Sequence, residues 1–353
     1  MTAVDQVLRL QSVDPCSDPR WAELMTGPDG SLFSSPPWLS AVVDTYGIDF
    51  TADVLVDPDG APVAGLARAQ LDDLRGARIN CSPFADRADP VADGGQWPRL
   101  AEPLLAAGVP VELRVMHAEA PLDDERFRQV NELAWHGTSL DRPEEEVLAS
   151  LHTTVRHNLR AAERRGVTVA LGDGLDDVRA FHQLQCLIRK RKYHLLAQPL
   201  AFFERLQERF APSGRFLVAL AHHEGDVIGG VMCLRWNDVM YYKFAASHPD
   251  RLQARPNEAL AWACMRAGRE WGCRTFDWGV SDLDQPGLVA YKGKYATEER
   301  RVRVLRHVPA GHDGSRAAEA GAVLGQLTAL LTREDVPDEV TQRAGELLYG
   351  YFC

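Results

Sequence analysis

The run from Leu55 to Leu66, L-V-D-P-D-G-A-P-V-A-G-L, is matched 165 residues later by the run from Leu220 to Val231, L-A-H-H-E-G-D-V-I-G-G-V. Each run has a strand pattern, then an acidic residue followed by Gly, then a second strand pattern. The acidic-Gly pair supplies the positive φ that a short hairpin turn needs. Gly65 and Gly230 coincide inside the second strand, which indicates a bulge or the close approach of a ligand to the backbone.

The same offset continues upstream, without a gap, through a helical pattern. Trp38 aligns with Phe203, Ala41 with Leu206 and Thr45 with Phe210. Each copy therefore reads as an amphipathic helix followed by a hairpin. A chance likeness between two hairpins is the alternative, but two matching segments in register favour two copies of one domain.

The composition is that of an ordinary globular chain that is long enough for two domains. It has 353 residues, 45% of them hydrophobic, and a formal net charge of −11. An acidic chain is not a general nucleic-acid binder, although a local basic groove stays open. No apolar run is long enough to cross a membrane, the N-terminus lacks a signal-peptide pattern, and the seven cysteines show neither a CxxC pair nor a zinc spacing. We expect a cytoplasmic protein with reduced thiols and no metal site.

The pattern of elements predicts an α+β fold of two tandem domains, each a mixed, mostly antiparallel sheet flanked by helices. We place the first domain at 1–140, the second at 141–312, and a C-terminal helical segment packed on them at 313–353. The predicted strands lie near 52–57, 62–70, 110–116, 167–169, 215–222, 227–236, 239–246, 273–278 and 300–308. The predicted helices lie near 37–46, 141–166, 175–192, 199–210 and 257–271, and 82–98 is read as a loop.

The predicted helix that opens the second domain has one basic face. Asp141 is its expected N-cap, and Gly166 ends it. Arg156, Arg160 and Arg164 follow one another at four-residue spacing, on the side opposite the apolar residues. This face is either a solvated helix surface or a rail for a polyanion, and the sequence leaves both open.

The signatures of serine hydrolases, zinc proteases, P-loop proteins and dinucleotide-binding folds are missing. In their place, the second half carries an ordered series of short motifs. They are R-x-N-L-R-x-A at Arg156–Ala162, P-N-x-x-L-x-W at Pro256–Trp262, F-D-x-G at Phe276–Gly279, and Tyr291-Lys292-Gly293-Lys294-Tyr295-Ala296 after an expected loop.

This ordered series resembles the Fem-type and BioF2-like branch of the GNAT superfamily, whose members carry two GNAT-like domains in tandem. The resemblance covers approximately 30–70 and 145–307. It implies an enzyme that transfers an acyl group to an amine. In the Fem branch the donor is aminoacyl-tRNA, and the acceptor is the amine of a peptide, often in a cell-wall precursor.

The resemblance also implies roles for individual residues. The motif lysine falls on Lys292, where a fixed ammonium would stabilise the tetrahedral oxyanion. Tyr242 matches a strand tyrosine that faces the acceptor, and Asp277 would orient an amine or a lysine, or else cap the end of its strand. No histidine is placed as a general base, which agrees with a neutral amine attacking an activated ester.

Further residues complete the predicted site. Arg191 falls where the family holds an arginine for an acceptor phosphate, although Lys192 follows it here in place of the usual Asp. The other expected substrate contacts are Tyr291, Tyr295, Asn257 and Trp278. The expected tRNA contacts are Arg156, Arg160, Arg164, Lys294 and Arg301.

The donor is the main choice that the sequence leaves. A GNAT enzyme that uses acyl-CoA binds the pyrophosphate on the backbone amides of a Gly-rich loop at a helix N-terminus. The matching stretch here, Arg251–Asn257, contains no Gly, and Pro256 removes one amide donor. We therefore expect aminoacyl-tRNA as co-substrate and no other cofactor, with an acyl-CoA such as acetyl-CoA as the alternative.

A catalytically silent module that binds peptidoglycan or a peptide is a third interpretation. The expected acceptor is a peptidoglycan precursor or a peptide antibiotic, since the composition suggests a GC-rich bacterium, where this fold is also used in antibiotic biosynthesis. A monomer is the expected oligomeric state.

Overall fold

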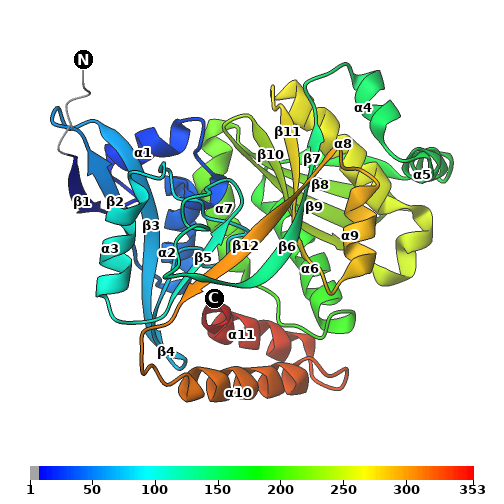
Figure 1. The fold of residues 1–353 in the computed structure, drawn as a ribbon. Helices are drawn as coiled ribbons and strands as arrows, with labels where there is room; N and C mark the ends of the chain where they lie inside the picture. The colour runs from blue at the N-terminus through cyan, green and yellow to red at the C-terminus, as the bar shows by residue number, and fades with distance from the viewer. Residues whose placement is uncertain (1–7) are drawn as a thin grey trace. The chain divides into compact units, whose positions relative to one another are not determined.

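The computed structural model describes residues 8–353, so residues 1–7 of the predicted first domain lie outside the described part. The chain divides into two compact units (Figure 1). Unit 1 comprises Met1–Leu133, Arg301–Ala320 and Cys353, and unit 2 comprises Ala134–Arg300 and Gly321–Phe352. Each unit is described separately below.

The strands of unit 1 follow the order β1-β2-β3-β4-β5-β12 in the sheet. Neighbouring strands in this order pair antiparallel, except for β4 and β5, which pair parallel. The elements are β1 (Arg9–Val13), α1 (Pro19–Thr26), η1 (Leu32–Ser34), α2 (Pro36–Tyr46), β2 (Phe50–Val56), β3 (Pro62–Asp73), β4 (Gly76–Asn80), α3 (Trp97–Ala106), β5 (Val111–Val115), the start of β6 (Arg128–Ser139), most of β12 (Glu298–His307) and the start of α10 (Ser315–Leu331).

The strands of unit 2 follow the order β6-β11-β10-β9-β8-β7, in which β10 and β11 run parallel. The pairs of β9 with β10 and β8, and of β8 with β7, are antiparallel. Its further elements are α4 (Glu144–Ser150), α5 (Thr153–Arg164), β7 (Thr168–Gly172), α6 (Leu175–Arg191), α7 (Leu200–Phe210), η2 (Ala211–Ser213), β8 (Phe216–His223), β9 (Asp226–Trp236), β10 (Val239–Ser247), η3 (Pro249–Ala254), α8 (Pro256–Glu270), β11 (Thr275–Asp282), α9 (Pro286–Gly293), α11 (Asp338–Leu348) and η4 (Tyr349–Phe352).

The two units repeat one order of elements, which confirms the α+β tandem fold expected from the sequence. The series β1-α1-α2-β2-β3-β4-α3-β5-β6 corresponds to β7-α6-α7-β8-β9-β10-α8-β11-β12. Both hairpin turns place Gly at positive φ, 91° at Gly60 and 89° at Gly225. The second series has one additional α-helix, α9, which lies between β11 and β12.

The matched glycines show which helices pack on the second strand of each hairpin. A Cβ on Gly65 would lie 3.0 Å from side-chain atoms of Leu24 and Trp21 in α1, and one on Gly230 would lie 3.1 Å from Phe181 in α6. The neighbouring Gly229 faces Leu260 of α8 instead, because successive strand residues point to opposite faces. Packed helices, rather than a ligand, therefore approach the backbone at these glycines. The bulge predicted at these glycines is wrong, because the register shifts of the two hairpins lie between Leu55 and Val56 and between Ala221 and His222.

The two units are discontinuous in sequence, whereas the predicted domains 1–140, 141–312 and 313–353 are consecutive. β6 begins in unit 1 and enters unit 2 at Ala134, while β12 enters unit 1 at Arg301. There β12 pairs antiparallel with β5, from Arg303 opposite Val115 to His307 opposite Val111. The last strand of each repeat thus contributes to the unit built mainly by the other repeat.

Three local predictions need correction. The single helix expected over 141–166 is two helices, because Leu151 leaves the helical conformation with ψ 145°. Pro143 is the N-cap of the first of them, and Asp141 forms an ion pair with Arg274 at 3.1 Å. The stretch 82–98 is a loop only as far as α3, which starts at Trp97 and was not foreseen.

Candidate functional site

The candidate site lies in unit 2, where β10 and β11 pair over a short distance. The parallel ladder in the described structure joins Val239–Tyr241 to Thr275–Asp277. Next to it, β10 shifts register against β9 between Tyr242 and Phe244, and such a shift bends a strand. Just past the last pair, the rings of Tyr242 and Trp278 pack with their centroids 5.0 Å apart. Aromatic side chains from both strands thus occupy the end of the ladder.

Tyr291 and Tyr295 extend these rings into an aromatic cluster of Tyr242, Trp278, Tyr291 and Tyr295. The Trp278 and Tyr295 centroids are 4.6 Å apart, and the Tyr291 and Tyr295 hydroxyls are separated by 3.2 Å. Thr138 of β6 holds the cluster in place: its Oγ1 accepts from Trp278 Nε1 at 2.9 Å and donates to the Tyr295 carbonyl at 2.7 Å. Sequence reasoning selected all four aromatic residues, and the structure brings them together.

Lys292 is carried by α9, a helix that was not predicted, because only a loop was expected before the lysine motif. Pro286 occupies the first turn, where its fixed φ suits a helix and its missing N–H is not needed. Lys292 lies in the last turn, where a cation is favoured by the helix dipole. Its Nζ donates to the carbonyl of Val280 in β11 at 2.8 Å. This bond holds the ammonium of the half-buried Lys292 against the backbone of β11, and Lys292 directly follows Tyr291 in the chain.

Asp277 has a visible structural contact at the end of the parallel ladder. Its side chain is 1% exposed, and Oδ1 accepts from the Gly279 backbone N–H at 2.7 Å. Gly279 has φ 68°, the left-handed region that favours Gly. The carboxylate therefore caps a turn inside β11, which is the second of the two roles considered for it. Its catalytic role stays a prediction.

The N-terminus of α8 borders the same cluster and carries a buried acid. Arg255 precedes the helix with φ 69°, and Pro256 is the first helical residue. Asn257 accepts a hydrogen bond from the Ser247 hydroxyl. Glu258 follows in the first turn, is 9% exposed, and accepts from Asn158 Nδ2 of α5 at 2.9 Å. The first turn of α8 therefore holds a carboxylate and lacks one backbone donor.

The tyrosines of the cluster are held in the neutral form. Burial raises the pKa of Tyr291 to about 12, and the nearby Glu258 charge adds to the shift. Burial likewise raises the pKa values of Tyr242 and Tyr295, with Tyr291 and Glu258 contributing in both cases. A neutral phenol donates a hydrogen bond at physiological pH, and a phenolate base is not formed there.

The predicted tRNA contacts fall on different elements. On α5, Val155 and Leu159 are buried, whereas Arg160 and Arg164 are exposed and Arg156 is half-buried. The exposed side chain of Lys294 follows α9 in the same unit. Arg301 belongs to unit 1 and lies 3.7 Å from Glu132. A role in tRNA binding stays a prediction for each of them.

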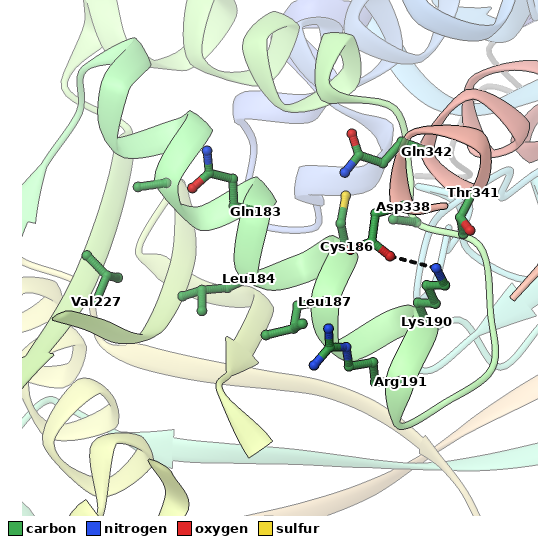
Figure 2. Close-up of a pocket in the computed structure, with 12 residues that line it drawn as sticks. Gln183, Leu184, Cys186, Leu187, Lys190, Arg191, Val227, Asp338, Thr341 and Gln342 are labelled. Atoms are coloured by element: carbon green, nitrogen blue, oxygen red, sulfur yellow. Dashed lines mark hydrogen bonds and ion pairs between the residues drawn. The ribbon is translucent and has the colours of Figure 1, made fainter. Parts of the chain in front are cut away.

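Arg191 is not part of the aromatic cluster. It is exposed at the end of α6 and lines a pocket of about 340 Å³ between α6 and α11, shown in Figure 2. Beside it, Lys190 donates to Asp338 at 2.6 Å (Figure 2) and also bonds the Val336 carbonyl. None of the catalytic candidates lines this pocket, so the predicted phosphate contact and the predicted catalytic residues lie in different places within unit 2.

Three side chains of the site were missed by sequence reasoning. Glu258 was visible only as part of the P-N-x-x-L-x-W motif, and Asn158 only as part of R-x-N-L-R-x-A. Thr138 lies on β6, which was not predicted. His136 of the same strand is buried, with Nε2 3.7 Å from Glu299 Oε2 and 4.0 Å from where a Cβ on Gly293 would lie. No local pattern could have marked these residues, because their partners are distant in sequence.

Among residues 8–353, no three His, Cys, Asp or Glu side chains are grouped in a way that could hold a metal ion. No helix of that part has the length and apolar character needed to span a bilayer.

The sequence and the fold were compared with those of known proteins. Residues 149–293 match the acetyltransferase (GNAT) domain family. By structure, the chain is similar to FemX, with a TM-score of 0.66, 15% identity, and coverage of 85% of this chain and 97% of that one. It is also similar to L-PGS from Bacillus licheniformis, with a TM-score of 0.55, 16% identity and coverage of 91% and 98%. No curated protein matches the chain by sequence at a significant level.

A further similar structure is a tandem GNAT protein from the clavulanic acid biosynthesis pathway. Its TM-score is 0.55, with 14% identity and coverage of 87% of this chain and all (100%) of that one. At these identities the likeness shows the fold. It confirms the predicted tandem GNAT-like fold, and the domain match over residues 149–293 supports the predicted acyltransferase.

Proposed function

We propose that the chain, whose residues 149–293 match the acetyltransferase (GNAT) domain family and whose fold is similar to that of FemX, moves an amino acid from aminoacyl-tRNA to a peptide amine. The product is an amide. The acceptor we propose is a peptidoglycan precursor or a peptide antibiotic, and the enzyme acts in the cytoplasm as a monomer.

The observation that carries the choice of donor is the N-terminus of α8. A pyrophosphate at this helix start would need free backbone N–H groups and a positive local field. Pro256 removes one N–H, and the buried Glu258 places a negative charge in the first turn. A carboxylate here repels a bound pyrophosphate, so this end of the helix favours a donor that does not deliver one. An aminoacyl ester meets that condition.

The proposed reaction needs few protein groups. The neutral amine attacks the ester carbonyl, and the tetrahedral intermediate carries an oxyanion. Lys292, fixed by its bond to the Val280 carbonyl, is the residue we assign to that charge. Collapse of the intermediate forms the amide and breaks the bond to the ribose oxygen of tRNA, which takes up the proton lost by the amine. The neutral hydroxyl of Tyr242 would orient the acceptor.

The test is a transfer assay with bulk tRNA charged with labelled amino acids and small peptide amines as acceptors. We expect transfer that RNase abolishes and that acetyl-CoA does not support. Transfer from acetyl-CoA that ignores RNase would overturn the proposed donor.

A second candidate function is acyl-CoA-dependent N-acylation. It is favoured by the match to the acetyltransferase domain family. It predicts that acetyl-CoA binds with its pyrophosphate at the start of α8, and that E258Q, which removes the repelling charge, tightens binding. Calorimetric titration of acetyl-CoA into the wild type and E258Q separates the two donors.

A further inference from the structure

Glu258 is a buried acid that the reaction outlined above does not use. Its side chain is 9% exposed, and Asn158 Nδ2 donates to Oε1 at 2.9 Å. Within residues 8–353 no Lys, Arg or His forms an ion pair with it, and Asn158 is its hydrogen-bond partner. A buried carboxylate is costly unless it is paired with a cation. Its place at the start of α8 offsets part of that cost.

The surroundings of Glu258 select the chemistry of a partner. The next two residues of α8, Ala259 and Leu260, belong to the same buried core as Trp278 and Tyr295, and Tyr242 and Tyr291 pack against that core. The Glu258 charge adds to the raised pKa values of the three tyrosines. Aromatic faces attract cations, and a carboxylate beside them adds a full opposite charge. This combination suits an ammonium group, whereas a phosphate or a carboxylate would be repelled.

The asparagine contact also argues for a binding role. The Asn158 amide donates to one carboxylate oxygen and brings no charge, so it fixes the direction of the carboxylate without neutralising it. A buried acid can be compensated by a cation, as Asp53 is by Arg68 at 2.7 Å in unit 1, or by a backbone N–H, as Asp277 is by Gly279 at 2.7 Å. Glu258 is instead oriented but uncompensated.

We propose that Glu258 binds the primary ammonium group of a substrate, with the aromatic cluster forming the wall of the site. The inference rests on the proposed function for the reaction that follows, but the binding step is the same for an aminoacyl-tRNA or an acyl-CoA donor. Two sources share this chemistry: the amine of the acceptor, which would give one proton to the Glu258 carboxylate before it attacks as the neutral amine, and the α-amino group of a donor amino acid.

The experiment measures binding by ligand-observed NMR with two pairs of probes of matched shape. Butylammonium and butanol report on an acceptor amine, and alaninamide and lactamide report on an α-ammonium. In the wild type we expect the ammonium member of one pair to bind about tenfold tighter than its hydroxyl analogue, and E258Q to remove this preference. If E258Q loses the preference for butylammonium over butanol, the ammonium belongs to the acceptor. If it loses the preference for alaninamide over lactamide, the ammonium is the α-amino group of the donor.

Glu163→Gln is the matched control, because Glu163 is an exposed acid on α5; we expect it to keep the preference. Equal binding of ammonium and hydroxyl probes by the wild type would overturn the inference, whether or not E258Q folds. A preference that survives in folded E258Q would overturn it too. Glu258-dependent binding without transfer from charged tRNA would instead leave the site standing and reject the proposed donor.

Discussion

The two repeats share one frame, yet only the second carries the candidate site. At the third residue of the equivalent helix, unit 1 has Arg99 in α3 where unit 2 has Glu258 in α8. Arg99 is exposed and donates to the Leu8 carbonyl at 2.6 Å, whereas Glu258 is buried beside the aromatic cluster. The shared fold therefore does not determine which repeat carries the candidate site. The difference lies in the side chains at the start of this helix and on the neighbouring strands.

The equivalent strands differ in the same way. β5 in unit 1 contributes aliphatic side chains to its core, namely Val111, Leu113 and Val115. β11 in unit 2 places Phe276 and Trp278 in its core, where Tyr242 and Tyr291 pack against them. Unit 2 also has α9 after β11, and no helix follows β5 before β6. The first repeat thus serves as an internal control for the second.

The largest effect should come from Lys292. Lys292→Ala removes the ammonium held at the Val280 carbonyl, and we expect the transfer rate to fall by about 10²–10³, as for loss of one oxyanion donor. Arg99→Ala, a basic residue of the first repeat, should leave the rate unchanged. Single-turnover transfer to a peptide amine measures both. A K292A rate within a fewfold of the wild type would show that this lysine does not stabilise the reaction.

The second test compares two buried indoles. Trp97 donates through Nε1 to Asp124 and Trp278 to Thr138, each at 2.9 Å. Replacing either with Ala should lower the free energy of unfolding by about 3–5 kcal/mol, measured by urea denaturation. Below the unfolding transition, we expect only W278A to lose transfer activity. An equal loss of activity in folded W97A would contradict the assignment of the site to the second repeat.

The third test uses the raised pKa values of the tyrosines in the aromatic cluster. With Tyr291 at about 12 when folded and near 10 when unfolded, the unfolded state loses its proton first as pH rises. The free energy of unfolding should therefore fall between pH 10 and 12, and be unaffected by this group below pH 10. Tyr291→Phe should make that decline shallower in urea denaturation. A phenolate absorbance change from Tyr291 below pH 10 would refute the buried, neutral assignment.

The sequence predicted those features that depend on local pattern. The hairpin turns at Gly60 and Gly225 and the periodic helices α6 and α7 needed only neighbouring residues. Trp278, Tyr291 and Tyr295 were found through ordered short motifs. Such features can be recognised in the sequence without knowledge of tertiary contacts.

The features that were missed depend on contacts between distant residues. Asn158 and Glu258 are separated by 100 positions, and Thr138 and Tyr295 by 157. The discontinuous units follow from the pairing of β12 with β5, which no local pattern encodes. α9 was missed because it is eight residues long, has no buried residue, and has Gly near both ends.

The smallest expected effect concerns the basic face of α5, where the sequence left two readings open. Arg160 and Arg164 are exposed on the face opposite the buried Leu159, and a tRNA phosphate near either would release counterions on binding. For the double variant R160A/R164A we expect a fewfold weaker affinity for tRNA, and a slope of log affinity against log salt that is shallower by about 1.4, roughly 0.7 for each lost contact.

Arg333 and Arg343 provide the matched control for that double variant. Both are exposed arginines in unit 2, paired with Asp335 at 2.8 Å and Glu346 at 2.6 Å. R333A/R343A removes the same charge from the chain, so it separates net charge from local contact. Filter binding at several salt concentrations measures both variants. If both double variants change the salt slope equally, the α5 face is a solvated surface. If only R160A/R164A changes the slope, the α5 face binds the tRNA phosphates.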